Sequence, residues 1–193
     1  MAIRCQSLES PFSPSPTISR SGGTLQMITS FHQAVNHHDP ETVLFKIHMM
    51  NHQLEVKKTI EITASLMEVW DALTDKETIK KYFFGTEAIS DWEEGSTLVF
   101  RGEWEGKSYE DKGTILEAIP GELLKYDYWS GFSGLEDIPE NYSTVSYTLE
   151  QTVDGTIIEL RQKGFASEEA LAHAEGGWTM VLDELKKLLE SYS

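Results

Sequence analysis

The chain has 193 residues, with 16 Lys and Arg against 32 Asp and Glu, and so a net charge of −16. An acidic surface repels nucleic-acid phosphates and anionic lipid headgroups, because binding them depends on Lys and Arg. We therefore expect neither a nucleic acid nor a membrane as a partner. No apolar run is long enough to cross a bilayer, and the N-terminus lacks a signal-peptide core, so the sequence predicts a soluble, cytoplasmic protein.

The distribution of charge divides the chain near Met50. Residues 1–49 carry three basic and three acidic side chains, so residues 50–193 hold the whole net charge. Residues 1–24 are rich in Ser and Pro, which is typical of disorder and, less well, of a transit peptide. Residues 25–48 show short stretches of helical spacing. We predict a disordered or loosely helical extension over residues 1–49, which could precede the natural start, and one domain over residues 50–193.

Residues that carry chemistry are scarce in the predicted domain. The only cysteine is Cys5, which excludes an intramolecular disulfide and cysteine catalysis within the domain. Five of the six histidines precede residue 53, so His173 is alone in the domain and is interpreted as a surface residue. The spacing shows no metal-ligand cluster, phosphate loop or nucleophile–base pair. We therefore predict no metal, no cofactor and no catalytic residue, and favour a protein that is not an enzyme.

The first elements of the domain have clear boundaries. Apolar and polar residues alternate from Leu54 to Ile62, which predicts a strand with one wet face. Ser65 and Glu68 form a capping box, in which each side chain binds a backbone amide of the other, and this predicts the start of a helix. Thr74 ends that helix, and Asp75 can cap a second short one.

A series of strands and a last helix complete the pattern. Turns are predicted at Pro120–Gly121 and Asp154–Gly155, between alternating runs over residues 98–104, 113–115, 124–128, 145–149 and 158–160. An apolar stripe from Trp178 to Leu189, opened by Gly176 and Gly177, predicts an amphipathic helix. An antiparallel meander with one wet face can bury its apolar side under such a helix, so we expect an α+β fold.

Five segments of the domain carry a family pattern: Ser65–Asp75, Gly113–Pro120, Leu124–Trp129, Gly134–Tyr142 and Trp178–Leu189. In these segments the chain closely resembles the bacterial activator-of-heat-shock-ATPase-homologue family. The family belongs to the START-like helix-grip superfamily. The resemblance implies a curved antiparallel sheet wrapped around a long C-terminal helix, two short helices after the first strand, and an apolar cavity between sheet and helix. It implies no particular reaction, because members of one fold carry out different functions.

Large inward-facing side chains are the candidates for the walls of this cavity. A single buried aromatic residue is usually part of the core, whereas several tyrosines on neighbouring strands could line a partly polar pocket. We expect the loop before the run over residues 145–149 to act as a rim, through Glu136, Asp137, Glu140 and Asn141, although loop acids are more often simply solvated. The predicted cavity residues are Trp70, Phe83, Phe100, Trp104, Tyr126, Tyr128, Tyr147, Leu160, Trp178 and Leu182.

The sequence alone is compatible with three functions. The first, which we favour, is binding of a small apolar or aromatic molecule in the cavity. The second is a co-chaperone-like protein that stimulates the ATPase of a heat-shock chaperone through its acidic surface. The third is a cyclase-like enzyme acting on polyketide or aromatic substrates, with Tyr126, Tyr128 or the loop acids as proton donors.

Overall fold

The computed structural model describes residues 54–104 and 106–191, without the side chain of Trp104. The predicted extension over residues 1–49, the boundary near residue 50 and Cys5 therefore lie outside the described residues. The elements are β1 (Glu55–Ile62), α2 (Leu66–Thr74), α3 (Lys76–Tyr82), β2 (Glu87–Ile89), β3 (Thr97–Trp104), β4 (Lys107–Ile119), β5 (Leu123–Trp129), the 3₁₀ turns η1 (Gly131–Ser133) and η2 (Pro139–Asn141), β6 (Ser143–Gln151), β7 (Thr156–Lys163) and α4 (Glu168–Glu190).

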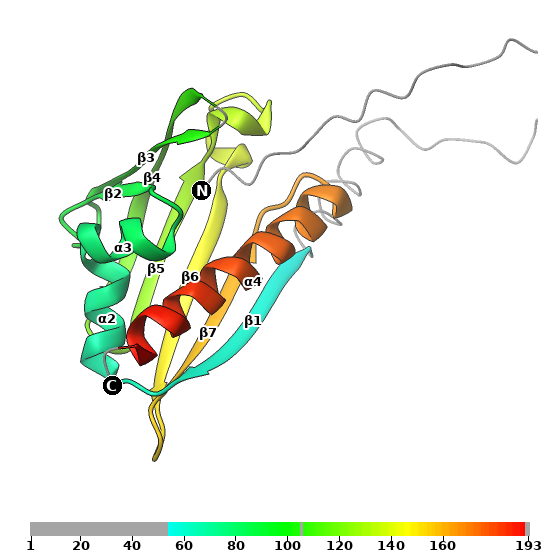
Figure 1. Cartoon of the computed structure of the whole chain (residues 1–193). Coiled ribbons are helices and arrows are strands. Elements are labelled where there is room, and N and C mark those ends of the chain that lie inside the picture. The colour runs from blue at the N-terminus through cyan, green and yellow to red at the C-terminus, as the bar shows by residue number, and fades with distance from the viewer. Residues whose placement is uncertain (1–53, 105, 192–193) are drawn as a thin grey trace, which may run out of the picture. The chain divides into compact units, whose positions relative to one another are not determined.

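The strands form one antiparallel sheet in the order β1-β7-β6-β5-β4-β3-β2. Helix α4 runs across one face of the sheet, and α2 and α3 lie beside its C-terminal end (Figure 1). From β2 to β7, each strand pairs with the strand that follows it in the chain. The exception is β1, the first strand, which pairs with β7, the last. This arrangement confirms the predicted α+β helix-grip fold, with two short helices after the first strand and the long helix at the end.

The caps of the two short helices are those predicted. The hydroxyl of Ser65 accepts a hydrogen bond from the Glu68 amide at 3.3 Å, and the Glu68 carboxylate accepts one from the Ser65 amide at 2.8 Å. At the start of α3, the Asp75 carboxylate accepts from the Thr78 amide at 2.8 Å. These bonds satisfy amide groups that have no partner within the helix, and so they set where each helix begins.

The start of the last helix was predicted wrongly. Helix α4 begins at Glu168, after an N-cap at Ser167 whose hydroxyl accepts from the Ala170 amide at 3.1 Å. Gly176 and Gly177, interpreted as the opening of the helix, lie in its interior. A mid-helix glycine costs about 1 kcal/mol relative to alanine, which tertiary packing can outweigh. Gly177 is buried, and the helix continues through it.

The main core lies between the C-terminal half of α4 and the sheet. Val181, Leu182 and Leu185 of α4 are buried in the same cluster as Ile62 of β1 and Leu160 of β7. Each such side chain contributes about 1.5–3 kcal/mol when it is fully removed from water. This half of α4 therefore anchors the helix to the sheet.

Strands β4 and β5 approach closely at Gly113. Gly113 lies opposite Tyr128 in the register, close to an irregularity in the pairing between Ile115 and Glu117. A Cβ atom on Gly113 would stand 1.9 Å from the backbone oxygen of Asp127, so only glycine fits here. The position matters for function because Tyr128 reaches the cavity described below.

Candidate ligand cavity

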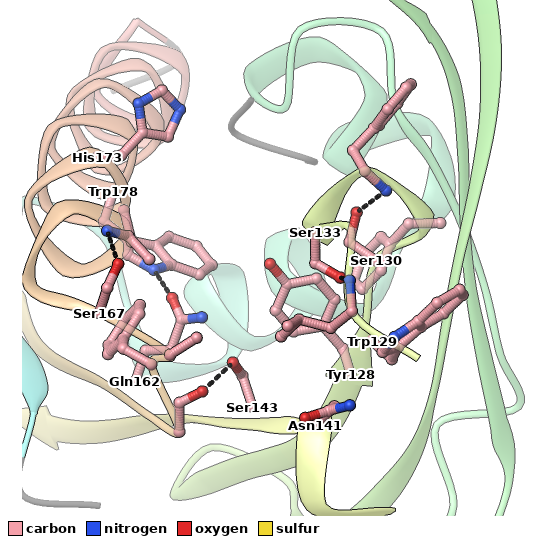
Figure 2. A pocket seen from close by; sticks show the side chains of 18 of the residues that line it. Tyr128, Trp129, Ser130, Ser133, Asn141, Ser143, Gln162, Ser167, His173 and Trp178 are labelled. Atoms are coloured by element: carbon pink, nitrogen blue, oxygen red, sulfur yellow. Dashed lines mark hydrogen bonds between the residues drawn. The ribbon is translucent and has the colours of Figure 1, made fainter. Parts of the chain in front are cut away.

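A cavity of about 210 Å³ lies between the N-terminal half of α4, the sheet and the segment that joins β5 to β6. Figure 2 shows its two sides, with His173 and Trp178 of α4 facing Ser130 and Ser133 of the joining segment. The described residues that line it include no Asp, Glu, Lys or Arg. In a chain of net charge −16, this separates an acidic exterior from an uncharged interior.

Small side chains on α4 leave the space open. Ala170 and Ala174 line the cavity from the helix, one turn apart, and each contributes only a methyl group. One turn further on, Trp178 and Val181 fill the space above the sheet. The cavity therefore ends where α4 changes from alanine to large residues.

The segment after β5 forms the opposite wall and is held by its own polar groups. The hydroxyl of Ser130 accepts from the Phe132 amide at 3.3 Å, and that of Ser133 accepts from the Leu135 amide at 3.2 Å. The Asn141 side-chain amide donates to the backbone oxygen of Glu136 at 2.8 Å. These bonds shape the turns so that Ser130, Phe132, Ser133, Leu135 and Asn141 face the cavity.

An ion pair ties this segment to the sheet. The ammonium of Lys112 on β4 pairs with the Asp137 carboxylate, which also accepts from the Tyr142 hydroxyl at 2.8 Å. The Lys112 bond holds the pKa of the Asp137 carboxyl below its ordinary value, and the Tyr142 hydroxyl lowers it further. Asp137 thus has a structural role on the outside of the wall.

Five aromatic rings contact one another in turn, and all of them except Tyr147 line one side of the cavity. Phe83 stacks on Phe100 with centroids 6.0 Å apart, and Phe100 contacts Tyr126 at 5.9 Å. Tyr126 contacts Tyr147 at 6.4 Å, and Tyr147 meets Trp178 edge-on at 6.1 Å. Trp178 returns to Phe83 at 6.0 Å, so the contacts form a closed circuit. Such pairs add about 0.5–1.5 kcal/mol each beyond area burial, which stabilises this wall.

A polar chain crosses the cavity beside these rings. The Trp178 indole N–H donates to Oε1 of Gln162 at 2.5 Å, and Gln162 is buried on β7. The Gln162 amide in turn interacts with the Tyr128 hydroxyl on β5. Burial, the larger effect, raises the pKa of Tyr128 above its ordinary value, and the Gln162 interaction lowers it in part. Tyr128 therefore keeps its proton at neutral pH.

Two ring nitrogens in the cavity walls lack a hydrogen-bond partner among the described residues. They are Nε2 of His173, on α4, and Nε1 of Trp129, at the end of β5, and both atoms are buried. A buried polar atom without a partner costs about 1–3 kcal/mol. A ligand that supplied a partner would recover part of this cost.

A buried carboxyl group lies behind the cavity wall. Asp111 on β4 is 0% exposed, lies opposite Phe100 in the register, and neither of its oxygens has a hydrogen bond of regular geometry. Burial raises the pKa of Asp111 above its ordinary value, although the Ser130 hydroxyl and the Gly131 amide are close enough to lower it in part. Its charge is felt at Tyr128, whose pKa it helps to raise.

The structure brings together some of the predicted site residues and separates others. Phe83, Phe100, Tyr126, Tyr128, Trp178 and, from the loop, Asn141 line the cavity. Trp70, Tyr147, Leu160 and Leu182 are buried in the core and are not among its lining residues. Glu136, Asp137 and Glu140 are exposed and also lie outside the lining. The side chain of Trp104 lies outside the described part of the chain.

Three polar residues of this region were missed in the sequence. Gln162 and Asp111 occupy inward positions of strands whose neighbouring inward residues, Leu160 and Ile115, are apolar, so strict alternation would have identified both. His173 was interpreted as a surface residue before the last helix. It lies on that helix, half-buried in the cavity wall, because the helix begins earlier than predicted.

Within residues 54–104 and 106–191, no three His, Cys, Asp or Glu side chains lie close enough together to hold a metal ion. In the same residues, no helix has the length and apolar character needed to span a membrane.

Comparisons with known proteins bear on the identity of this fold. The family model of "Activator of Hsp90 ATPase homolog 1-like protein" matches residues 63–190. The solved structure of ChR145 from Cytophaga hutchinsonii is 43% identical over 72% of this chain and 96% of that chain, with a TM-score of 0.64. CalU16 from Micromonospora echinospora is 28% identical over 69% and 71% of the two chains, with a TM-score of 0.53. A search among curated proteins gave no match.

The Aha1 dimer from Colwellia psychrerythraea is similar in fold, at 20% identity over 72% of this chain and 97% of that chain, with a TM-score of 0.58. The family match spans nearly all described elements, from the end of β1 to the end of α4. This confirms the resemblance found in the sequence. The chain therefore belongs to the family of activator of Hsp90 ATPase homolog 1-like proteins.

Proposed function

We propose that this protein binds a small, apolar, ring-containing molecule in the cavity under α4. The observation that supports this most is a space of about 210 Å³ whose walls include Phe83, Phe100, Tyr126 and Trp178. A dry protein cavity of about 150 Å³ is large enough to bind benzene. Most drug-sized sites are larger, at about 300–1,000 Å³. The size therefore favours ligands of one or two rings.

Filling the cavity should remove this binding. Ala174→Leu adds a branched side chain at the lining position of α4, so it should occupy space that a ligand needs. We expect naphthalene to raise the thermal midpoint of the wild type and to leave that of Ala174→Leu unchanged. At a hundredfold excess over the dissociation constant, the wild-type gain is about 2.7 kcal/mol.

The matched control is Ala172→Leu, an exposed position on the same helix that is not among the lining residues. It should respond to naphthalene as the wild type does. If the wild type shows no shift with naphthalene or with any other neutral one- or two-ring compound, the proposal is wrong and the aromatic residues only form core.

A second candidate is stimulation of a heat-shock chaperone ATPase, which the name of the matched family favours. The acidic exterior could attract a basic surface of a chaperone, and salt would screen that attraction. We rank it second because the cavity has a defined shape and a specific lining, whereas an excess of acidic residues also increases solubility. We expect no increase in chaperone ATPase rate when the protein is added at micromolar concentration. A saturable increase that salt weakens would reverse this order.

The cyclase-like alternative would require a group that exchanges protons with a substrate. Tyr128 is the titratable side chain that the polar chain orients, and burial raises its pKa. A phenol with a raised pKa is a weaker acid, so Tyr128 is poorly suited to be the proton donor that this alternative requires. The cavity chemistry therefore supports binding over proton transfer.

A further inference from the structure

The orientation of the Gln162 amide follows from its partner. An indole N–H can only donate, so the Gln162 atom that receives the Trp178 bond must be the carbonyl oxygen, Oε1. The NH₂ group then points away from Trp178. Figure 2 shows Trp178 and Gln162 on one side of the cavity and Tyr128 on the other, with the NH₂ group directed toward the space between them.

Tyr128 supplies a second donor at the same place. The Gln162 amide is near enough to the Tyr128 hydroxyl to affect its pKa, and the hydroxyl hydrogen can rotate toward the cavity that Tyr128 lines. Because burial raises the pKa of Tyr128, that hydrogen is present throughout the neutral pH range. Two neighbouring donors of this kind are complementary to one acceptor oxygen with two lone pairs.

The charges around this point select an uncharged oxygen. The described lining residues include neither Lys nor Arg, so a carboxylate in the cavity would be buried without a cation. Burying an unpaired charge is far more costly than burying a carbonyl. The buried Asp111 carboxyl near Tyr128 adds to the cost, because any negative charge there repels an anion.

We propose that Tyr128 and Gln162 form a two-donor clamp for the carbonyl oxygen of an uncharged aromatic ketone, an inference about the ligand that rests on the proposed function. The rings of the ketone would lie against Phe83, Phe100 and Trp178, whose contacts fix that wall. Trp178 thus has two roles, since its ring packs against the ligand and its N–H orients the clamp. Gln162 and Tyr128 become the residues that determine specificity.

The test compares three probes that share one bicyclic frame: indane, 1-indanone and 1-indanecarboxylate. Titration calorimetry measures the dissociation constant of each for the wild type, Tyr128→Phe and Tyr126→Phe. Tyr126 lines the same cavity, but its hydroxyl interacts with that of Tyr147, so Tyr126→Phe is the matched control. Both changes remove one oxygen and keep the ring.

We expect Tyr128→Phe to weaken 1-indanone binding about fivefold, because one hydrogen bond is lost. The same change should leave indane within about twofold, and Tyr126→Phe should leave the ratio of the two probes within about twofold as well. The carboxylate should bind the wild type about tenfold or more weakly than the ketone, because no cation accompanies it.

The possible failures are distinguishable. If indane and 1-indanone both bind and Tyr128→Phe weakens them equally, the clamp is wrong and the proposed function stands. The same conclusion follows if Tyr126→Phe produces the selective loss, or if the carboxylate binds best. If none of the three probes binds, the cavity is not a site for ring compounds and both proposals fail.

Discussion

Replacing Gly113 by alanine is expected to lower the free energy of unfolding by about 3 kcal/mol or more, through overpacking of strands β4 and β5. The added Cβ would stand 1.9 Å from the backbone oxygen of Asp127 and 3.0 Å from Cα of Tyr128. Backbone atoms cannot move aside as a flexible side chain can, so the two strands must separate. For a domain of this size the thermal midpoint should fall by about 6–12 °C.

Urea unfolding measures the loss, with an unchanged m-value as evidence that the unfolded state is the same. Gly176→Ala is the matched control, because a Cβ at this exposed position of α4 meets nothing within 4 Å. Alanine in a helix interior is favoured over glycine, so this variant should gain about 0.5–1 kcal/mol. Equal stabilities for the Gly113 variant and the wild type would show that β4 and β5 have room to separate.

The second large effect is expected from Asp111→Asn, which should stabilise the protein at neutral pH by about 1 kcal/mol or more, because asparagine never carries the charge that burial disfavours and one pKa unit corresponds to about 1.4 kcal/mol. Asparagine keeps the shape of the side chain and cannot ionise. The folded state disfavours the charged carboxylate of Asp111, because both oxygens are buried without a regular hydrogen bond. The gain is the removal of that penalty.

The pH dependence has a definite sign. The pKa of Asp111 is raised in the folded state above its ordinary value of 3.8, so the folded state binds the proton more tightly than the unfolded state. Stability of the wild type therefore falls as the pH rises from about 3.8 through the folded-state pKa. The two proteins should be equally stable at the acidic end of this range and diverge above it.

Urea unfolding of both proteins at a series of pH values measures this divergence. Glu110→Gln serves as the control, since Glu110 is the neighbouring acid on β4 and is exposed, in an ion pair with Arg101. It should show no gain at neutral pH. A constant difference between Asp111→Asn and the wild type at every pH would mean that Asp111 does not titrate within the folded range.

Most of the fold could be predicted because its signals are local. The alternation between Leu54 and Ile62 reflects a single strand with one face in water, and the Ser65–Glu68 cap involves two residues only three positions apart. Both can therefore be identified without knowledge of the rest of the fold. The start of α4 was predicted wrongly because two adjacent glycines locally disfavour a helix. The packing of the helix against the rest of the protein overrides this local preference. Gly177 is buried, and only the assembled sheet shows that the helix continues there.

The cavity could be predicted only in part. Alternation identifies inward residues, so Tyr126 and Tyr128 were found together, but it cannot tell which inward residues meet empty space. Here the space depends on Ala170 and Ala174, whose small size matters only because no neighbour fills the gap. Alternation places Gln162 at an inward position, but its role becomes clear only when its partner, the Trp178 indole, is known.

The two halves of α4 differ in what holds them. Val181, Leu182 and Leu185 are buried in the core, whereas the first turns of the helix rest on a space bordered by Ala170 and Ala174. The free energy of local opening is lower in regions with fewer buried contacts than the free energy of unfolding the whole protein. The first turns of α4 should thus detach and re-form while its second half stays docked. Such an opening would give a ligand a route to the cavity. The hydrogen bond between Trp178 and Gln162 would mark the boundary between the part of the helix that opens and the part that stays docked.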